Sequence, residues 1–309
     1  MRPATPLALS SGDLIADRRF EWARDAQEKG DFAAAAELLE QALELAPAYS
    51  SAWFALGESR EKLGDFAEAI EAFRRARELD PEDRHGAALH LMRLGALPAG
   101  VMPPGYVRAL FDQFAPDFDR ALGEGLSYRA PELLLNAVKM ARGSRPMKFG
   151  SLLDLGCGTG LGGAAFRPFV DRLTGADLSG GMIAKARAKG LYDRLVESDV
   201  TAFLNGEAGV AARYDLILAA DVFVYFGDLA PVLNAAARVL APNGLAAFTV
   251  ETHRGDGVLL RETLRYAHGA AHARAAVEGA GLKLLGLDSA STRMEKGEPV
   301  PGLVAVAGP

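Results

Sequence analysis

The chain lacks the features that would place it in a membrane or an oxidising compartment. It has one cysteine, Cys157, in 309 residues, so it cannot form an internal disulfide. No apolar run reaches the roughly 18 residues that a membrane-spanning helix needs. The apolar stretch near the start is also too short for a secretory signal. We therefore expect a cytoplasmic protein.

A surplus of positive charge is missing too. The net charge is −6, and the first hundred residues hold 12 Lys and Arg against 18 Asp and Glu, whereas the remainder holds 22 of each. Nucleic-acid binding depends on clustered Lys and Arg that neutralise phosphates. Nucleic acid is therefore disfavoured as a partner. The length itself favours two domains.

An internal repeat fills most of the first hundred residues. KGDFAAAAELLEQALELAP and LGDFAEAIEAFRRARELDP superimpose with a shift of 34 residues, so that Gly30 matches Gly64 and Ala35 matches Ala69. Small residues at matched positions allow two antiparallel helices to pack closely, and each repeat buries its apolar face on its neighbour. The pattern resembles the tetratricopeptide repeat. The second copy also has the family's large and small residues, namely Trp53, Leu56, Gly57 and Phe73.

Two repeats are fewer than such arrays usually need, so we expect the segment Arg84–Leu97 to form a capping helix. An all-helical module over residues 1–97 follows. Its role is either protein binding or a structural one, as a brace or dimerisation element, and the sequence leaves both open. Residues 98–105, rich in Pro and Gly, predict a linker, and residues 106–309 predict a second domain.

The second domain contains a glycine-rich loop that is a candidate for ligand binding. In KFGSLLDLGCGTGLGGAAF, an apolar strand runs into a turn and then into a segment able to start a helix. The pattern D-x-G-x-G-x-G is formed by Asp154, Gly156, Gly158 and Gly160, with Cys157 at a variable position, and it differs from the dinucleotide fingerprint G-x-G-x-x-G. Glycines leave bare backbone against which a ligand fits. The pattern resembles motif I of class I methyltransferases.

This resemblance implies a cradle for S-adenosylmethionine. Asp154 would contact the ligand's ammonium, with support of the loop as the alternative. A second strand ends at Asp177, where a carboxylate can accept hydrogen bonds from both ribose hydroxyls. Ser179 is the better candidate for the cap of the following helix. Leu178 and Met182 follow Asp177 beside the predicted adenine site, with plain core packing as the alternative for Met182.

Further strand ends add polar side chains to the same edge. The third strand ends near Asp199 and Val200, which are expected to contact adenine, and the fourth is followed by Asp221 and Tyr225. After a Pro-Asn-Gly turn, a fifth strand carries Glu251 and then His253 to this edge. Because ligands of parallel α/β sheets bind at the carboxyl ends of the strands, these residues predict the site.

The resemblance spans about residues 106–307 and implies a Rossmann-like α/β domain. Its seven-stranded, mostly parallel sheet would have an antiparallel last strand, formed by LKLLGLD and LVAVA around a long loop. The passage FDQFAPDFD is similar to the lid helix of methyltransferases of quinone and biotin biosynthesis. Tyr106 and Tyr128 flank this lid and are further candidates for contact with the cofactor. Repeats ahead of such a domain resemble a predicted bacterial family of repeat-containing methyltransferases.

The expected function is methyl transfer from S-adenosylmethionine, with S-adenosylhomocysteine as product, to a small and anionic metabolite. His253 and Tyr225 are the candidates for catalysis. The five histidines show no metal-ligand spacing, so no metal is expected. Cations for an acidic acceptor are Arg129, Arg265 and Arg293, and His268 lies in the segment expected to close the pocket. The alternatives are a cofactor-binding scaffold without catalysis, a protein methyltransferase that recruits its substrate through the repeats and, third, a nicotinamide dehydrogenase.

Overall fold

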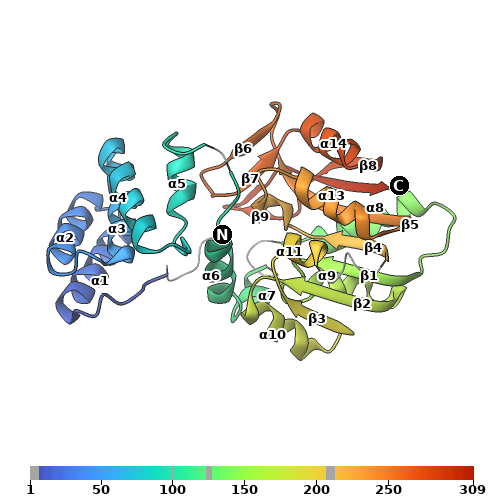
Figure 1. Cartoon of the computed structure of the whole chain (residues 1–309), viewed down its shortest axis with the longest axis horizontal. Coiled ribbons are helices and arrows are strands. Elements are labelled where there is room, and N and C mark those ends of the chain that lie inside the picture. The colour runs from blue at the N-terminus through green and yellow to red at the C-terminus, as the bar shows by residue number, and fades with distance from the viewer. Residues whose placement is uncertain (1–6, 99, 123–126, 207–212) are drawn as a thin grey trace. The chain divides into compact units, whose positions relative to one another are not determined.

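The chain divides into two compact units. The structure is a computed structural model, and it describes residues 7–98, 100–122, 127–206 and 213–309. One unit ends at Leu110 and the other begins at Phe111, so the division falls within helix α6, Pro104–Phe114 (Figure 1). This helix begins inside the segment predicted as a linker. Proline is favoured in the first turn of a helix, where its missing N–H is not needed, and Pro104 occupies that turn.

Helices form the first unit, in two pairs followed by a short helix. Gly30 and Gly64, at the turn within each pair, have φ angles of 79° and 86°, which glycine adopts readily. The side chains of Asp13 and Asp31 cap the helices that follow them by accepting backbone N–H bonds. The expected capping helix is present but covers only seven residues. The helices are α1 (Leu14–Glu28), α2 (Phe32–Leu45), α3 (Ser50–Leu63), α4 (Phe66–Leu79) and α5 (Ala87–Arg93).

The close contact between α3 and α4 explains two residues of the repeat pattern. A Cβ atom at Gly57 would lie 2.6 Å from the ring of Phe73, so the ring fills the space that a side chain at position 57 would need. Phe73 is fully buried, as are Ala35 and Ala69 at matched positions of the two repeats. The small residues therefore let large ones of the neighbouring helix reach the core.

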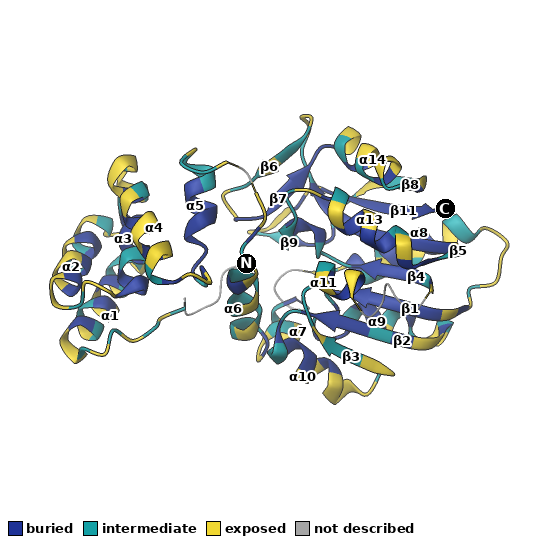
Figure 2. Cartoon of the chain, viewed as in Figure 1, coloured by how far each residue is buried: buried dark blue, intermediate teal, exposed yellow. Residues whose placement is uncertain are grey.

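A twisted sheet forms the centre of the second unit. Its main order is β3-β2-β1-β4-β5-β11-β8, and β11 runs antiparallel to both of its neighbours, as predicted for the last strand. β4 and β11 are buried along nearly their whole length (Figure 2). The strands of this order are β1 (Phe149–Leu155), β2 (Val170–Asp177), β3 (Arg194–Glu197), β4 (Tyr214–Ala219), β5 (Leu240–Thr252), β8 (Lys283–Ala290) and β11 (Gly302–Gly308).

Helices cover both faces of this sheet, as a parallel sheet buried on both sides requires (Figure 1). Leu134 of α8 and Phe166 of α9 belong to the apolar core of one face. Phe203 of α11, Val232 of α13 and Val277 of α14 belong to the core of the other face. The helices of this unit include α8 (Ala130–Arg142), α9 (Leu161–Phe166), α10 (Gly180–Lys189), α11 (Val200–Asn205), α13 (Ala230–Val239) and α14 (Ala270–Gly279).

Two features of the sheet go beyond the predicted seven strands. Short strands β6 (Val258–Leu260) and β7 (Tyr266–His268) extend it beside the end of β5. The Pro-Asn-Gly segment, predicted as a turn ahead of the fifth strand, lies instead inside β5, where the register with β4 shifts. Within the described residues, no helix combines the length and the apolar character needed to cross a membrane.

Candidate active site

The glycine loop between β1 and α9 is held in left-handed backbone conformations. Gly156, Gly158 and Gly160 have φ angles of 60°, 54° and 93°, which residues with a Cβ rarely adopt. A Cβ at Gly156 would lie 2.5 Å from the Val222 side chain. At Gly158, by contrast, the nearest atom is a ring carbon of Phe118 at 3.9 Å. Packing therefore fixes the start of the loop, whereas a side chain at its middle would meet only an ordinary van der Waals contact with Phe118.

The carboxylate of Asp177 joins this loop to the tip of β2. One oxygen accepts the N–H of Gly158 at 2.8 Å and the other accepts the N–H of Ser179 at 2.9 Å. Burial raises the pKa of Asp177, and these hydrogen bonds oppose the rise. Ser179 caps α10 as expected, by accepting the N–H of Met182. Each carboxylate oxygen retains a second acceptor site that a ligand can use.

Asp154 lies in the protein interior near the end of β1, next to the loop. Its buried carboxylate accepts the Tyr192 hydroxyl at 2.7 Å. Burial raises the pKa of Asp154 to about 7; the charge of Asp177 adds to the rise, and the bond from Tyr192 opposes it. A Cβ at Gly163 would lie 2.3 Å from the Tyr192 oxygen, so glycine at this helical position admits the tyrosine. These contacts favour the loop-supporting alternative for Asp154.

Residues 111–122, which we name the lid segment, are bound to the loop and to α10 by two aspartates. Asp112 accepts the Ser179 hydroxyl at 2.5 Å and the N–H of Gly181 at 3.1 Å. Asp119 accepts the Thr159 hydroxyl and pairs with Lys189 at 2.6 Å. The passage predicted as a lid therefore lies over the cradle.

Two aromatic rings of the lid segment extend this cover along the strand edge. Phe118, in the short helix α7 (Phe118–Arg120), lies next to Gly158, and the centroid of its ring is 6.0 Å from that of Phe111. Phe111 lies 5.4 Å from the ring of Tyr225, in the 3-10 turn η3 (Phe223–Tyr225) that follows β4. The lid segment thus spans from the glycine loop to the end of the fourth strand.

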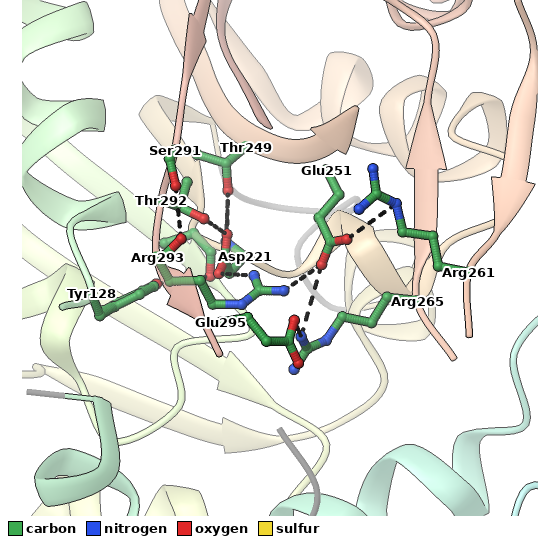
Figure 3. Close-up of polar contacts among 11 residues, drawn as sticks. Tyr128, Asp221, Thr249, Glu251, Arg261, Arg265, Ser291, Thr292, Arg293 and Glu295 are labelled. Atoms are coloured by element: carbon green, nitrogen blue, oxygen red, sulfur yellow. Dashed lines mark hydrogen bonds and ion pairs between the residues drawn. The ribbon is translucent and has the colours of Figure 1, made fainter. Parts of the chain in front are cut away.

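A network of ion pairs begins at Asp221, directly after β4 (Figure 3). Asp221 has a φ angle of 58°, unusual for a residue other than glycine. Its carboxylate accepts hydrogen bonds from Thr249 at 3.1 Å, Thr292 at 2.9 Å and Arg293 at 2.9 Å. These bonds from β5 and from the loop after β8 hold the strained residue in place.

Glu251 of β5 continues the network and is approached by three guanidinium groups (Figure 3). Arg293 donates a hydrogen bond to its carboxylate, and both side chains are almost fully buried. Arg261 and Arg265 lie farther away, each with one nitrogen 3.8 Å from a carboxylate oxygen of Glu251. Arg265 also lies 3.9 Å from Glu295. Of the three arginines, only Arg293 is therefore in close contact with Glu251, whereas Arg261 and Arg265 lie farther from it.

Two protein families match the two units. Residues 20–84 match the family described as tetratricopeptide repeat, and residues 153–246, which include the glycine loop, match the one described as methyltransferase domain. The chain carries a methyltransferase domain behind tetratricopeptide repeats. The predicted repeats and methyltransferase domain are thereby confirmed, and the predicted fold class is confirmed by the order of the sheet and by solved structures.

Solved structures share the fold of this methyltransferase domain at low identity. Magnesium protoporphyrin IX methyltransferase from Synechocystis PCC 6803, with bound S-adenosylhomocysteine, is 16% identical, with a TM-score of 0.51 over 66% of this chain and 98% of that chain. The 1,6-didemethyltoxoflavin-N1-methyltransferase of Burkholderia thailandensis, with its substrate and S-adenosylhomocysteine, is 18% identical, with a TM-score of 0.50 over 68% of this chain and 92% of that one. No curated protein sequence matches the chain.

Four further residues predicted to contact the cofactor follow β2 and β3 or lie in the helices after these strands. Met182 is fully buried in α10, and Val200 belongs to the apolar core under α11. Leu178 is half-buried between Asp177 and Ser179. Asp199 caps α11 by accepting the N–H of Ala202 at 2.8 Å.

Cys157 and the two tyrosines differ in their surroundings. Cys157 is buried, and its sulfur lies 2.9 Å from a Cβ built at Gly175, so it packs against β2. Burial raises the pKa of the Cys157 thiol well above its ordinary value. Tyr128 lies near Asp221, and burial followed by the charge of Asp221 raises its pKa. Tyr106 belongs to the first unit, where its ring packs against Gly86.

The residues predicted to contact the acceptor have different surroundings in the structure. Arg129 places its guanidinium on the surface, paired with Glu132. His268 is fully buried in β7, and burial lowers its pKa to about 4, so it is neutral at pH 7. Its ring is stacked 5.6 Å from that of His272. His253, just after β5, is partly exposed and lies 3.3 Å from the carbonyl oxygen of Gly257.

Several structural contributors to the site were not foreseen from the sequence. Tyr192 supports the loop from the turn before β3, and its only signal is the pair of extra glycines at the start of α9. Asp112 and Asp119 were visible only as members of the lid passage. Thr249 and Thr292 carry no sequence signal, because their bonds to Asp221 join segments far apart in the chain.

Proposed function

We propose that this protein transfers the methyl group of S-adenosylmethionine to a small, anionic acceptor. The observation that carries the proposal is Gly158, where a built Cβ would meet no atom nearer than 3.9 Å, in a left-handed loop whose N–H is accepted by the buried acid Asp177. A loop with only a structural role has no need of bare backbone facing an acid at the tip of the second strand. This combination suits a ligand with a ribose and a positive charge.

The residues around the loop fit the cofactor. Gly158 leaves room for it, and the second acceptor sites of Asp177 would take the ribose hydroxyls. Leu178 and Asp199, at the ends of β2 and β3, would border the adenine. Met182, Val200 and Cys157 would shape the cradle from beneath, because their side chains are buried in its walls.

When bound, S-adenosylmethionine would supply a methyl group activated by its sulfonium, with S-adenosylhomocysteine as the leaving group. The protein's tasks are then alignment and exclusion of water. Phe111 and Phe118 of the lid segment supply an apolar cover above the strand ends. If the acceptor carries a proton, His253 or Tyr225 is the candidate to remove it, since both follow strands that end at this edge.

The acceptor edge carries more cationic groups than the cofactor edge. Arg261, Arg265 and Arg293 all approach Glu251, and this suits an acid better than a cation. The domain has no excess of positive charge that would favour a polyanion. His268 would contribute a neutral, buried wall. For the repeats, we propose association with a protein partner or a second copy of the chain.

Thermal-shift titration of the full chain with S-adenosylmethionine, S-adenosylhomocysteine and NAD tests the cofactor. The expected result is a rise in melting temperature with the first two ligands and none with NAD, because a ligand that binds only the folded state stabilises it. A rise with NAD alone would reassign the domain to hydride transfer. No rise with any of the three would favour a scaffold.

A further inference from the structure

The three arginines near Glu251 differ in how well their donors are used. Arg293 directs one terminal nitrogen to Asp221 and the other to Glu251, so its guanidinium is held between two carboxylates. Arg261 donates to the carbonyl oxygen of Thr252 at 2.7 Å and is about a quarter exposed. Both groups therefore have partners within the protein.

Arg265 is also buried, but not all of its hydrogen-bond donors have a partner. The residue is 9% exposed, and its Nη1 nitrogen has no hydrogen-bond partner among the described residues. The nearest carboxylates, of Glu251 and Glu295, are 3.8 Å and 3.9 Å from this nitrogen, too far for a hydrogen bond. A buried donor without a partner destabilises a protein, so such groups in native proteins normally meet a ligand or a water.

The position of Arg265 links it to the reaction. Its guanidinium lies close to the side chain of Tyr225, in the turn after β4. The ring of Tyr225 in turn contacts Phe111 of the lid segment. The unused donor therefore lies beside the same strand ends and the same cover as the proposed methyl donor.

The surrounding charge limits what this donor can bind. Glu251 and Glu295 lie within 4 Å of the same nitrogen, so they offset most of its positive charge. A second negative charge on the ligand would be repelled by both carboxylates. A monoanion with two oxygens, which matches the planar guanidinium fork, suits the site better than a phosphate dianion.

We infer that Arg265, beside Tyr225, binds a carboxylate of the methyl acceptor. This inference rests on the proposed function, and it makes the acceptor an acid with an apolar body beside Phe111 and Tyr225. It also moves the anion contact away from Arg293, whose two ion pairs hold Asp221 and Glu251 in place.

Equilibrium dialysis of the chain saturated with S-adenosylhomocysteine tests the inference with three probes that share a ring: benzoate, benzamide and phenyl phosphate. Benzoate should bind at least about tenfold more tightly than benzamide or phenyl phosphate, as expected for a charge-assisted hydrogen bond. Arg265→Gln should remove this preference, and Arg265→Lys, which keeps the charge but loses the fork, should restore part of it. Arg74→Gln, which changes an exposed arginine of the first unit, is the control and should bind like the wild type.

The outcomes separate this inference from the function beneath it. S-adenosylhomocysteine affinity is measured first for every variant, and an unchanged value shows that the fold and the cradle are intact. Equal binding of benzoate to the wild type and to Arg265→Gln would overturn the inference while leaving the cofactor assignment standing. Tighter binding of phenyl phosphate than of benzoate would also overturn it. Failure of the wild type to bind S-adenosylhomocysteine would instead reject the proposed function.

Discussion

The two halves of the strand edge in the methyltransferase domain use buried acids in opposite ways. At the ends of β1 and β2, Asp154 and Asp177 accept hydrogen bonds from backbone N–H groups and a tyrosine hydroxyl. At the ends of β4 and β5, Asp221 and Glu251 accept them from guanidinium groups. Among the described residues, no cation pairs with the buried acids of the first half, whereas arginine pairs with those of the second half.

This difference shows how one edge can receive two ligands of unlike charge. Burial without a cation raises the pKa of Asp154 to about 7 and raises that of Asp177, so these groups favour an approaching cation. The arginine-rich half has no such preference, and its unused donor on Arg265 favours an anion. We expect the positive cofactor on the first half and the acidic acceptor on the second.

The largest effect on stability should come from removing the arginine that neutralises the acids at the ends of β4 and β5. Arg293→Ala would leave Asp221 and Glu251 without their buried partner and should reduce the free energy of unfolding by about 3 to 5 kcal/mol. Chemical denaturation followed by circular dichroism measures this. Arg129→Ala, at an exposed pair, is the control and should leave stability nearly unchanged, because exposed ion pairs contribute little. A similar small loss for Arg293→Ala would mean that the network does not hold the edge together.

The role of Gly158 in the first half is tested by Gly158→Val. The new side chain would occupy the space at the loop and require an unfavourable φ angle, so S-adenosylhomocysteine binding should weaken at least about a hundredfold, roughly 2.7 kcal/mol. Gly190→Val is a matched control, because Gly190 has a φ angle of 65° with no atom within 4 Å of its built Cβ. It should strain the backbone without affecting affinity. Calorimetric affinity equal to wild type for Gly158→Val would show that the ligand lies elsewhere.

The raised pKa of Asp154 predicts a pH dependence of stability. Between about pH 4 and pH 7 the unfolded chain ionises this carboxyl while the native state keeps the proton, so its contribution to stability falls as the pH rises. Asp154→Asn does not titrate. Its stability relative to the wild type should therefore increase from pH 4 to pH 7 by on the order of 2 to 4 kcal/mol and then level off. A difference independent of pH would show that Asp154 is ionised throughout.

Asp177→Ala should remove the ribose contact and the anchor of the loop. We expect binding of S-adenosylhomocysteine to weaken by about 1.5 to 3 kcal/mol, the usual value for lost hydrogen bonds to a charged group. Isothermal calorimetry measures it. Asp171→Ala, at an exposed pair with Lys148, serves as control. If both variants bind with wild-type affinity, Asp177 has no part in the site.

The smallest effect should follow removal of residues 1–97. Because the second compact unit begins at Phe111 and α6 begins at Pro104, the shortened chain retains both. It should stay soluble and bind S-adenosylhomocysteine within about threefold of the full chain, as expected for a separate domain. Aggregation in size-exclusion chromatography would show that the repeats are needed for the fold of the methyltransferase domain.

The sequence predicted the first half of the edge better than the second, for a physical reason. The glycine loop, Asp177 and the Ser179 cap belong to one continuous strand–turn–helix–strand passage, whose geometry is fixed by local backbone rules. Arg293 meets Asp221 across 72 positions of the chain, and Arg265 precedes a short strand that no periodic pattern marks. Such pairs depend on tertiary packing, so Arg265 appeared in the sequence only as one of several cations. Tyr192 was missed for the same reason.

Transfer of a labelled methyl group from S-adenosylmethionine is the direct test of a small, acidic acceptor. The full chain and Gly158→Val are incubated with methyl-tritiated S-adenosylmethionine and a cell extract, which is then separated by size into small molecules and protein. With the wild type, we expect label in the small-molecule fraction, in a compound that an anion-exchange column retains. With the variant, we expect no label. Label confined to the protein fraction would contradict this expectation and make the repeats the recruiting surface, and equal label with both chains would mean that the glycine loop takes no part in the reaction.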